Sequence, residues 1–223
     1  MRTTGMSSQT HKKKHSILNN NKGFTLIEIA IVLVIIGLIL GSVLKGKDLI
    51  NSSKQKKFYT TFLKTWQLSV ASYYDRTGYM LGDGTINGGT AANPDGHFDN
   101  ISGATFGAAN GIDATLKKVG LEVFKGNTAN SGQYSFEGAY SGTSTITLYL
   151  YYLTSHTDGN AANRLYLTNV PTDLAIALDK IVDGQMNSVT GSFRQYPDNT
   201  DATGAWPDAS TTRTVNCSLL IDL

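Results

Sequence analysis

The sequence predicts an α+β protein in which one long N-terminal helix packs on an antiparallel β-sheet. An apolar run over residues 24–44 continues, without a proline, into an amphipathic pattern that reaches about residue 75. Beyond residue 130, several short segments alternate apolar and polar side chains. This alternation is typical of strands in an antiparallel sheet that is covered on one face.

A chain of 223 residues has room for one domain with accessory segments, and the charge distribution suggests where these lie. We expect a leader at residues 1–23, a long helix at residues 24–75 and a globular head at residues 76–223. The leader contains five Lys and Arg residues and no acid, whereas the rest contains 14 basic and 17 acidic residues. Positive charge beside a membrane span favours the cytoplasmic side, so the head is expected outside.

The apolar run at residues 24–44 is expected to span a membrane. As a helix it measures about 31 Å, which matches the hydrocarbon core of a bilayer. Its single charged residue is Glu28. A carboxylate at this depth is costly unless it is paired, so Glu28 is a candidate functional residue.

The motif Lys22-Gly23-Phe24-Thr25-Leu26-Ile27-Glu28 resembles the processing site of type IV prepilins and of the pseudopilins of type II secretion. The resemblance implies a pilin-like fold and processing by a prepilin peptidase that cuts after Gly23. It implies further that Phe24 becomes a methylated N-terminus. Glu28 would then neutralise the terminal amine of a neighbouring subunit during assembly.

By the same resemblance, the chain is expected to be a structural subunit of a type IV pilus or pilus-like filament, with no enzymatic activity and no cofactor. The implied partners are other copies of itself, the prepilin peptidase, an inner-membrane assembly platform with its motor ATPase, and membrane lipid before assembly. The implied location is the inner membrane, with the leader inside, and then a filament at the cell surface. The alternatives are a minor pseudopilin of type II secretion or DNA uptake, and a membrane-tethered adhesin or binding module.

Two features of the helix bear on its packing. Gly37 and Gly41 form a small-xxx-small pattern that allows apolar helices to approach closely. Residues 45–75 contain six lysines and two aspartates. These lysines could attract anionic lipid headgroups, or they could meet the acidic heads of packed subunits, and both interpretations stay open.

In the head, residues 78–111 are predicted to form a long loop, followed by a short helix at residues 113–119 with Asp113 as its cap. A helix at residues 171–182 is expected to turn Leu174, Leu178 and Ile181 inward. The strands are predicted at residues 133–140, 144–153, 164–170 and 212–221. We expect Tyr134, Phe136 and Tyr140 to share one face of the first strand.

Two head segments resemble stretches found in a subset of prepilins. In residues 74–83, Leu81 replaces the proline of the Pro-Gly-Asp sequence that is usual in that subset, while Gly82 and Asp83 are present. Residues 177–184, followed by Thr190, Gly191 and Arg194, resemble a second signature, which we interpret as a structural helix–turn–strand unit.

Other candidate sites are weak. The spacing of Gly41 to Lys47 resembles a phosphate loop, but that loop requires free backbone amides and a preceding strand. We expect no metal site: His97 and His156 are expected in solvent, and Tyr149, Tyr151 and Tyr152 in ordinary strand packing. Two sets of aspartates could offer oxygen ligands to calcium but lack the spacing of a known loop, namely Asp198, Asp201 and Asp208, and Asp83, Asp95 and Asp99.

Cys217 is the only cysteine, so an intramolecular disulfide is impossible. Apolar residues alternate around it, which predicts a buried position on the core face of the last strand.

Overall fold

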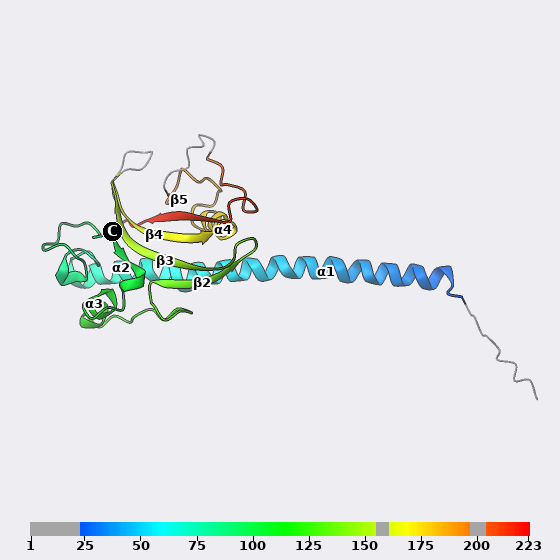
Figure 1. Ribbon diagram of the computed structural model, residues 1–223, viewed down its shortest axis with the longest axis horizontal. Helices are drawn as coiled ribbons and strands as arrows, with labels where there is room; N and C mark the ends of the chain where they lie inside the picture. Colours follow the sequence, from blue (N-terminus) through cyan, green and yellow to red (C-terminus); the bar gives the residue numbers. More distant parts are fainter. Residues whose placement is uncertain (1–22, 155–160, 197–203) are drawn as a thin grey trace, which may run out of the picture. The chain divides into compact units, whose positions relative to one another are not determined.

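The computed structural model describes residues 23–154, 161–196 and 204–223. The chain forms two compact units, Met1–Gly46 and Lys47–Leu223. A long N-terminal helix is followed by an open antiparallel sheet (Figure 1). The predicted α+β fold class is therefore confirmed.

The helical segment consists of α1 (Leu26–Phe58), a π-helical turn η1 (Tyr59–Leu63) and α2 (Lys64–Thr77). It ends at Gly78, whose positive φ of 72° suits glycine and whose N–H bonds the Tyr74 carbonyl. The prediction of helical structure over residues 24–75 is thus confirmed within two residues at either end.

The π turn was not predicted, and the spacing of the buried side chains explains it. Phe58, Phe62, Trp66 and Val70 are all fully buried and recur every four residues. In a regular α-helix each four-residue step would rotate this stripe by about 40°. A wider π turn takes up part of that rotation and keeps the stripe facing the core.

Within the described residues, the sheet has six strands in the order β1-β3-β4-β6-β5, and β2 also pairs with β3. Every pairing is antiparallel. The strands are β1 (Ile101–Ser102), β2 (Gln133–Gly138), β3 (Gly142–Leu153), β4 (Ala162–Pro171), β5 (Phe193–Gln195) and β6 (Thr214–Leu220). The four predicted strands are confirmed within a few residues, whereas the short strands β1 and β5 were missed.

The core lies between the helical segment and one face of this sheet. Ile146, Leu148 and Leu150 of β3 are fully buried. Phe58 meets the ring of Tyr134 edge-on at 5.1 Å between centroids, and the indole Nε1 of Trp66 donates to the Ser131 carbonyl at 3.1 Å. One face of the sheet is therefore covered, as the alternation predicts.

Cys217 is fully buried in this core, in agreement with the prediction. Loss of solvation raises the pKa of its thiol well above the ordinary value. At neutral pH the thiol is therefore protonated and behaves as a small apolar side chain.

Two predictions about side chains in the head are wrong. Tyr140 is not on the core face, because β2 ends at Gly138 and Tyr140 lies in the turn to β3 with 56% of its surface exposed. Asp113 does not cap helix α3 (Ile112–Lys118), because the cap position falls on Gly111. The Asp113 carboxylate instead accepts the hydroxyl of Ser131 at 2.6 Å.

Helix α4 (Thr172–Asp183) buries Leu174 and Leu178, while Ile181 is half-buried. Beyond Gly184 the chain turns into β5. The Asp183 carboxylate accepts the backbone N–H groups of Ser192 and Phe193 at 2.9 and 2.8 Å. The segment therefore forms the helix–turn–strand unit that the sequence suggested.

The outer edge of β2 is protected by a side chain. Asn127 accepts the N–H of Ser135 at 2.8 Å through Oδ1 and donates to the Ser135 carbonyl at 2.7 Å through Nδ2. Its amide thus imitates a neighbouring strand. This contact limits the pairing of the edge with another chain.

Candidate functional site

The site that the sequence singles out lies at the start of α1. Gly23, Phe24 and Thr25 precede the helix, and Phe24 has 84% of its surface exposed. No heavy atom lies within 4 Å of the position that a Cβ would take on Gly23. The bond between Gly23 and Phe24 is therefore unobstructed by the part of the chain that the structure describes.

Glu28 is held by Thr25 in a reciprocal capping arrangement. Its Oε2 accepts the backbone N–H and the hydroxyl of Thr25, both at 2.7 Å, while its own N–H points to Thr25 Oγ1 at 3.3 Å. This is the capping box of a Thr-x-x-Glu motif, which satisfies donors that a helix start leaves unpaired. Sequence reasoning did not single out Thr25, although the Thr-x-x-Glu spacing is its signal.

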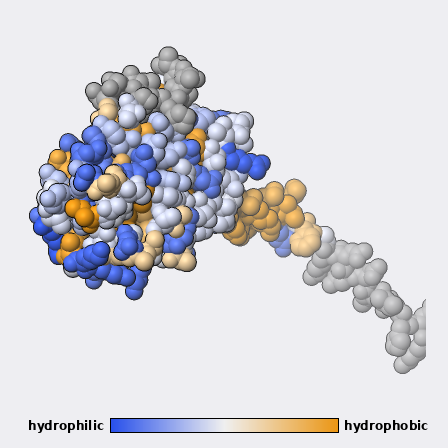
Figure 2. Space-filling view, turned by 60° about the vertical axis from the view of Figure 1, so that its left-hand side comes forward, coloured by the Kyte–Doolittle hydropathy of each residue, from blue (hydrophilic) through white to orange (hydrophobic). Residues whose placement is uncertain are grey.

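The apolar side chains after Glu28 are exposed along the helix, as Figure 2 shows in orange. The described residues contain one helix, Leu26–Thr77, that is long and apolar enough to cross a membrane. Gly37 and Gly41 lie in its apolar part with no heavy atom within 4 Å of a built Cβ. Because residues four apart lie on the same helix face, both open positions face one direction.

Among the described residues, the aspartates considered for calcium accept hydrogen bonds within their own loops. Asp83 is buried, and its carboxylate accepts the N–H groups of Asp95 and Gly96 at 3.0 and 2.7 Å. Asp99 Oδ2 accepts three backbone N–H groups, those of residues 84, 90 and 91, at 2.7–2.9 Å. In the second set, Asp208 accepts from Ser210 at 2.7 Å, and Asp198 and Asp201 lie outside the described residues.

The expectation that His97 lies in solvent holds in part, because 45% of its side-chain surface is exposed while its ring also makes contacts. Its ring stacks on Tyr152 at 3.8 Å between centroids, and Nδ1 lies 3.4 Å from Asp95 Oδ1. Tyr152 itself packs against the core. His156 lies outside the described residues.

Tyr149 and Tyr151 do take part in strand packing, on the face of the sheet opposite the core. Their rings contact Tyr166 of β4 at 5.7 and 5.3 Å between centroids, and Tyr166 also meets Tyr196 at 5.4 Å. Burial among these phenols raises the pKa of Tyr166 to about 12. The sequence did not indicate Tyr166 and Tyr196 as members of this cluster, because they are distant along the chain.

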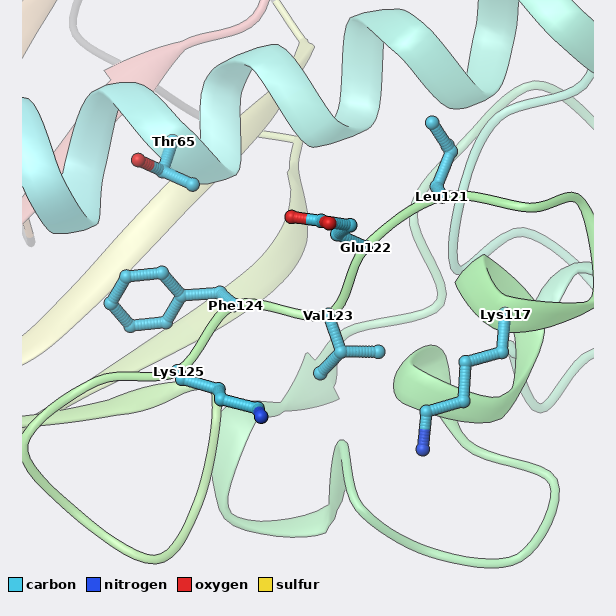
Figure 3. Close-up of a pocket in the computed structure, with 7 residues that line it drawn as sticks. All are labelled: Thr65, Lys117, Leu121, Glu122, Val123, Phe124 and Lys125. Carbon is cyan, nitrogen blue, oxygen red and sulfur yellow. The ribbon is translucent and has the colours of Figure 1, made fainter.

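An open groove of about 570 Å³ lies beside the helical segment in the head (Figure 3). It is lined by Thr65, Lys117 and residues 121–125. Figure 3 shows Val123 between the ammonium groups of Lys117 and Lys125. The lining contains neither a nucleophilic cysteine nor a histidine base, and none of the residues singled out from the sequence contributes to it.

A family model described as the prokaryotic N-terminal methylation motif matches residues 18–44. Comparison with curated proteins and with solved structures found no match. The matched segment includes Gly23, Phe24 and Glu28 and ends with the apolar run, so it leaves the head uncovered. The match therefore bears on the start of α1 and not on the groove or the tyrosine cluster.

Proposed function

We propose that this chain, whose residues 18–44 are a type IV prepilin-type signal motif, is a structural subunit of a type IV pilus or of a pilus-like filament. The motif points to a structural subunit rather than an enzyme. One observation carries the proposal: Glu28 is the only charged residue in the exposed apolar run at residues 24–44, which has membrane-spanning length as a helix. A lone carboxylate in such a segment calls for a functional reason.

Processing is the first step. A prepilin peptidase would hydrolyse the bond between Gly23 and Phe24 and leave Phe24 as the new N-terminus, which is then methylated. The open surroundings of Gly23 and the exposure of Phe24 support this step. The helix begins only at Leu26, so the cut would not require the helix to unwind.

Glu28 would then define how subunits align. In the single chain, Thr25 supplies hydrogen bonds to the carboxylate but no positive charge. The amine freed at Phe24 of an adjacent copy could supply that charge. A subunit out of register would leave a carboxylate and an amine unpaired in an apolar surrounding, at a cost of several kcal/mol.

Close packing of the apolar helices would accompany this pairing. Gly37 and Gly41 present backbone without side chains on one face, which suits van der Waals contact between helices. Other copies of the chain, an inner-membrane assembly platform and its motor ATPase are the proposed partners. Before assembly the chain would be anchored in the inner membrane, and afterwards it would form part of a surface filament.

The mass of the mature N-terminus tests the processing step. We expect a chain that begins at a methylated Phe24. Gly23→Val is expected to retain the leader, because a branched side chain replaces the hydrogen of glycine at the cut. A chain that still begins at Met1 in cells would refute the proposed processing.

Filament yield tests the role of Glu28. Glu28→Ala is expected to leave cleavage largely intact and to impair assembly. Asp48→Ala is the matched control, because it removes a carboxylate from the same helix outside the apolar run. Electron microscopy of labelled surface fractions reads the result: normal fibres from Glu28→Ala would contradict this role, and diffuse membrane label from the unaltered chain would favour a tethered binding module.

A further inference from the structure

We propose that the head carries a lipid-binding basal surface, formed by Lys47, Leu49, Ile50, Lys54 and Tyr140, which contacts anionic lipid headgroups while the chain is anchored in a membrane. This inference rests on the membrane anchoring in the proposed function. It concerns the state before assembly and assigns a role to residues outside the signal motif.

The basal surface joins two segments that are distant in sequence. Tyr140 lies at the turn between β2 and β3, and this hairpin lies beside α1 (Figure 1). Lys47, Ile50 and Lys54 of α1 line one open cavity of about 490 Å³ together with Tyr140. The turn is held in place, because the N–H of Ala139 donates to Asp173 at 3.1 Å.

The composition of this surface suits the boundary between lipid and water. Leu49, Ile50 and Tyr140 are each more than half exposed, at 70, 58 and 56%. Tyrosine rings and long basic side chains are enriched at the headgroup level, where an apolar body and a polar tip are both satisfied. Exposed aliphatic side chains beside them add apolar contact with the upper part of the acyl chains.

The charge of the segment points to an anionic partner. Residues 45–57 contain five lysines and one acid, Asp48. Lys54 pairs with Glu137 at 2.9 Å. Among the described residues, no salt bridge engages the other four lysines. They are therefore available to the negative surface potential of a membrane.

The short connection between the apolar run and Lys47 limits how far the basal surface can lie from the membrane. Lys47 follows the end of the apolar run at Leu44 by three residues and Ile50 by six. Six residues span about 9 Å as a helix and about 21 Å when fully extended. Each headgroup region is about 5–8 Å thick, so Ile50 lies at most about 4 Å beyond it when the connection is helical and at most about 16 Å beyond it when the connection is extended.

A second copy of the chain is the competing occupant, because the head is acidic. Lysines alone would serve that contact equally well. The exposed side chains of Leu49, Ile50 and Tyr140 favour lipid, because they can enter the apolar boundary of the bilayer while the lysines contact the headgroups. The experiment must therefore separate lipid contact from contact between copies.

The test uses the full-length chain reconstituted in vesicles that contain brominated phosphatidylcholine and an anionic lipid. The variant Tyr140→Trp places a fluorophore on the basal surface, and the signal of the unaltered chain is subtracted. Tyr79→Trp is the matched control: Tyr79 is 51% exposed but follows the far end of α2, about 40 Å away by helix rise. We expect the bromine to quench Tyr140→Trp at least twice as strongly as Tyr79→Trp.

A second arm tests the charge. In the Tyr140→Trp background, Lys47→Glu is expected to reduce quenching in anionic vesicles, since each lysine near such a surface strengthens binding about fivefold. In vesicles of zwitterionic lipid alone, Lys47→Glu is expected to have little effect.

Three outcomes would overturn the proposal. Equal quenching of the two variants in vesicles that retain the chain would refute the basal surface and leave the anchoring intact. Quenching that depends on the protein-to-lipid ratio would assign the surface to a second copy. Failure of the chain to float with the vesicles would refute the anchoring itself, and the basal surface with it.

Discussion

Replacing Asp179 by asparagine is expected to stabilise the head at neutral pH. Asp179 of α4 is fully buried. Its Oδ2 accepts the N–H of Asn187 at 2.6 Å and the indole N–H of Trp206 at 2.7 Å. Its Oδ1 has no hydrogen-bond partner among the described residues, and the carboxyl of Asp183 lies close enough to interact.

The magnitude follows from these contacts. A buried acceptor without a partner costs about 1–3 kcal/mol. Asparagine keeps an oxygen for both N–H donors and places an amide in the position of Oδ1, where it can donate to Asp183. We therefore expect a gain of about 1–3 kcal/mol. Asp179→Ala leaves both N–H donors without an acceptor and is expected to lower the free energy of unfolding by about 2–5 kcal/mol.

The stability of the unaltered head should depend on pH through this carboxyl. Burial is the main cause that raises the pKa of Asp179, and the nearby Asp183 adds to it. A carboxyl with a raised pKa in the folded state binds its proton more tightly there than in the unfolded chain. The contribution of Asp179 to the stability of the head is therefore complete at pH values below the ordinary pKa of aspartate. It is lost as the pH rises through the raised pKa of the folded state.

Urea unfolding of the full chain in detergent, followed by tryptophan fluorescence at about pH 5 and about pH 8, measures both effects. Asp179→Asn should raise the midpoint at the higher pH and flatten the dependence on pH. Asp179→Ala is the control for loss of the two hydrogen bonds. If asparagine lowers the midpoint at pH 8 as alanine does, the unpaired oxygen is not the costly atom and the reasoning fails.

Substitutions at three further positions test the packing of the head. Asp99→Ala removes the acceptor of three backbone N–H groups and should make residues 84–97 several-fold more sensitive to protease, whereas Asp99→Asn, which keeps an oxygen, should change this less. Asn127→Ala should lower the free energy of unfolding by about 1 kcal/mol. Because it also frees the strand edge at Ser135, it should cause concentration-dependent association that light scattering detects. Stable monomers would contradict this role. Trp66→Phe should lower stability by about 1–3 kcal/mol in the same urea assay, because it leaves the Ser131 carbonyl buried and unpaired, and an unchanged midpoint would contradict that.

The start of α1 could be found from the sequence because its signal is contiguous. Gly23, Phe24 and Glu28 lie within six residues, and the apolar run that follows needs no partner from elsewhere in the chain. The fold class was also predictable, since each long strand and helix carries its own periodicity. Thr25 escaped notice, although its capping role is equally local.

What only the tertiary structure decided is the set of contacts between distant segments. β1 and β5, with two and three residues, are too short to show an alternation and exist because longer strands offer them an edge.

In the basal surface, Ile50 and Tyr140 line the same cavity, and in the tyrosine cluster the rings of Tyr149 and Tyr166 are in contact. Local periodicity determines which residues turn inward. Which of them meet depends on strand register and on the packing of the helix across the sheet, which no short stretch of sequence contains.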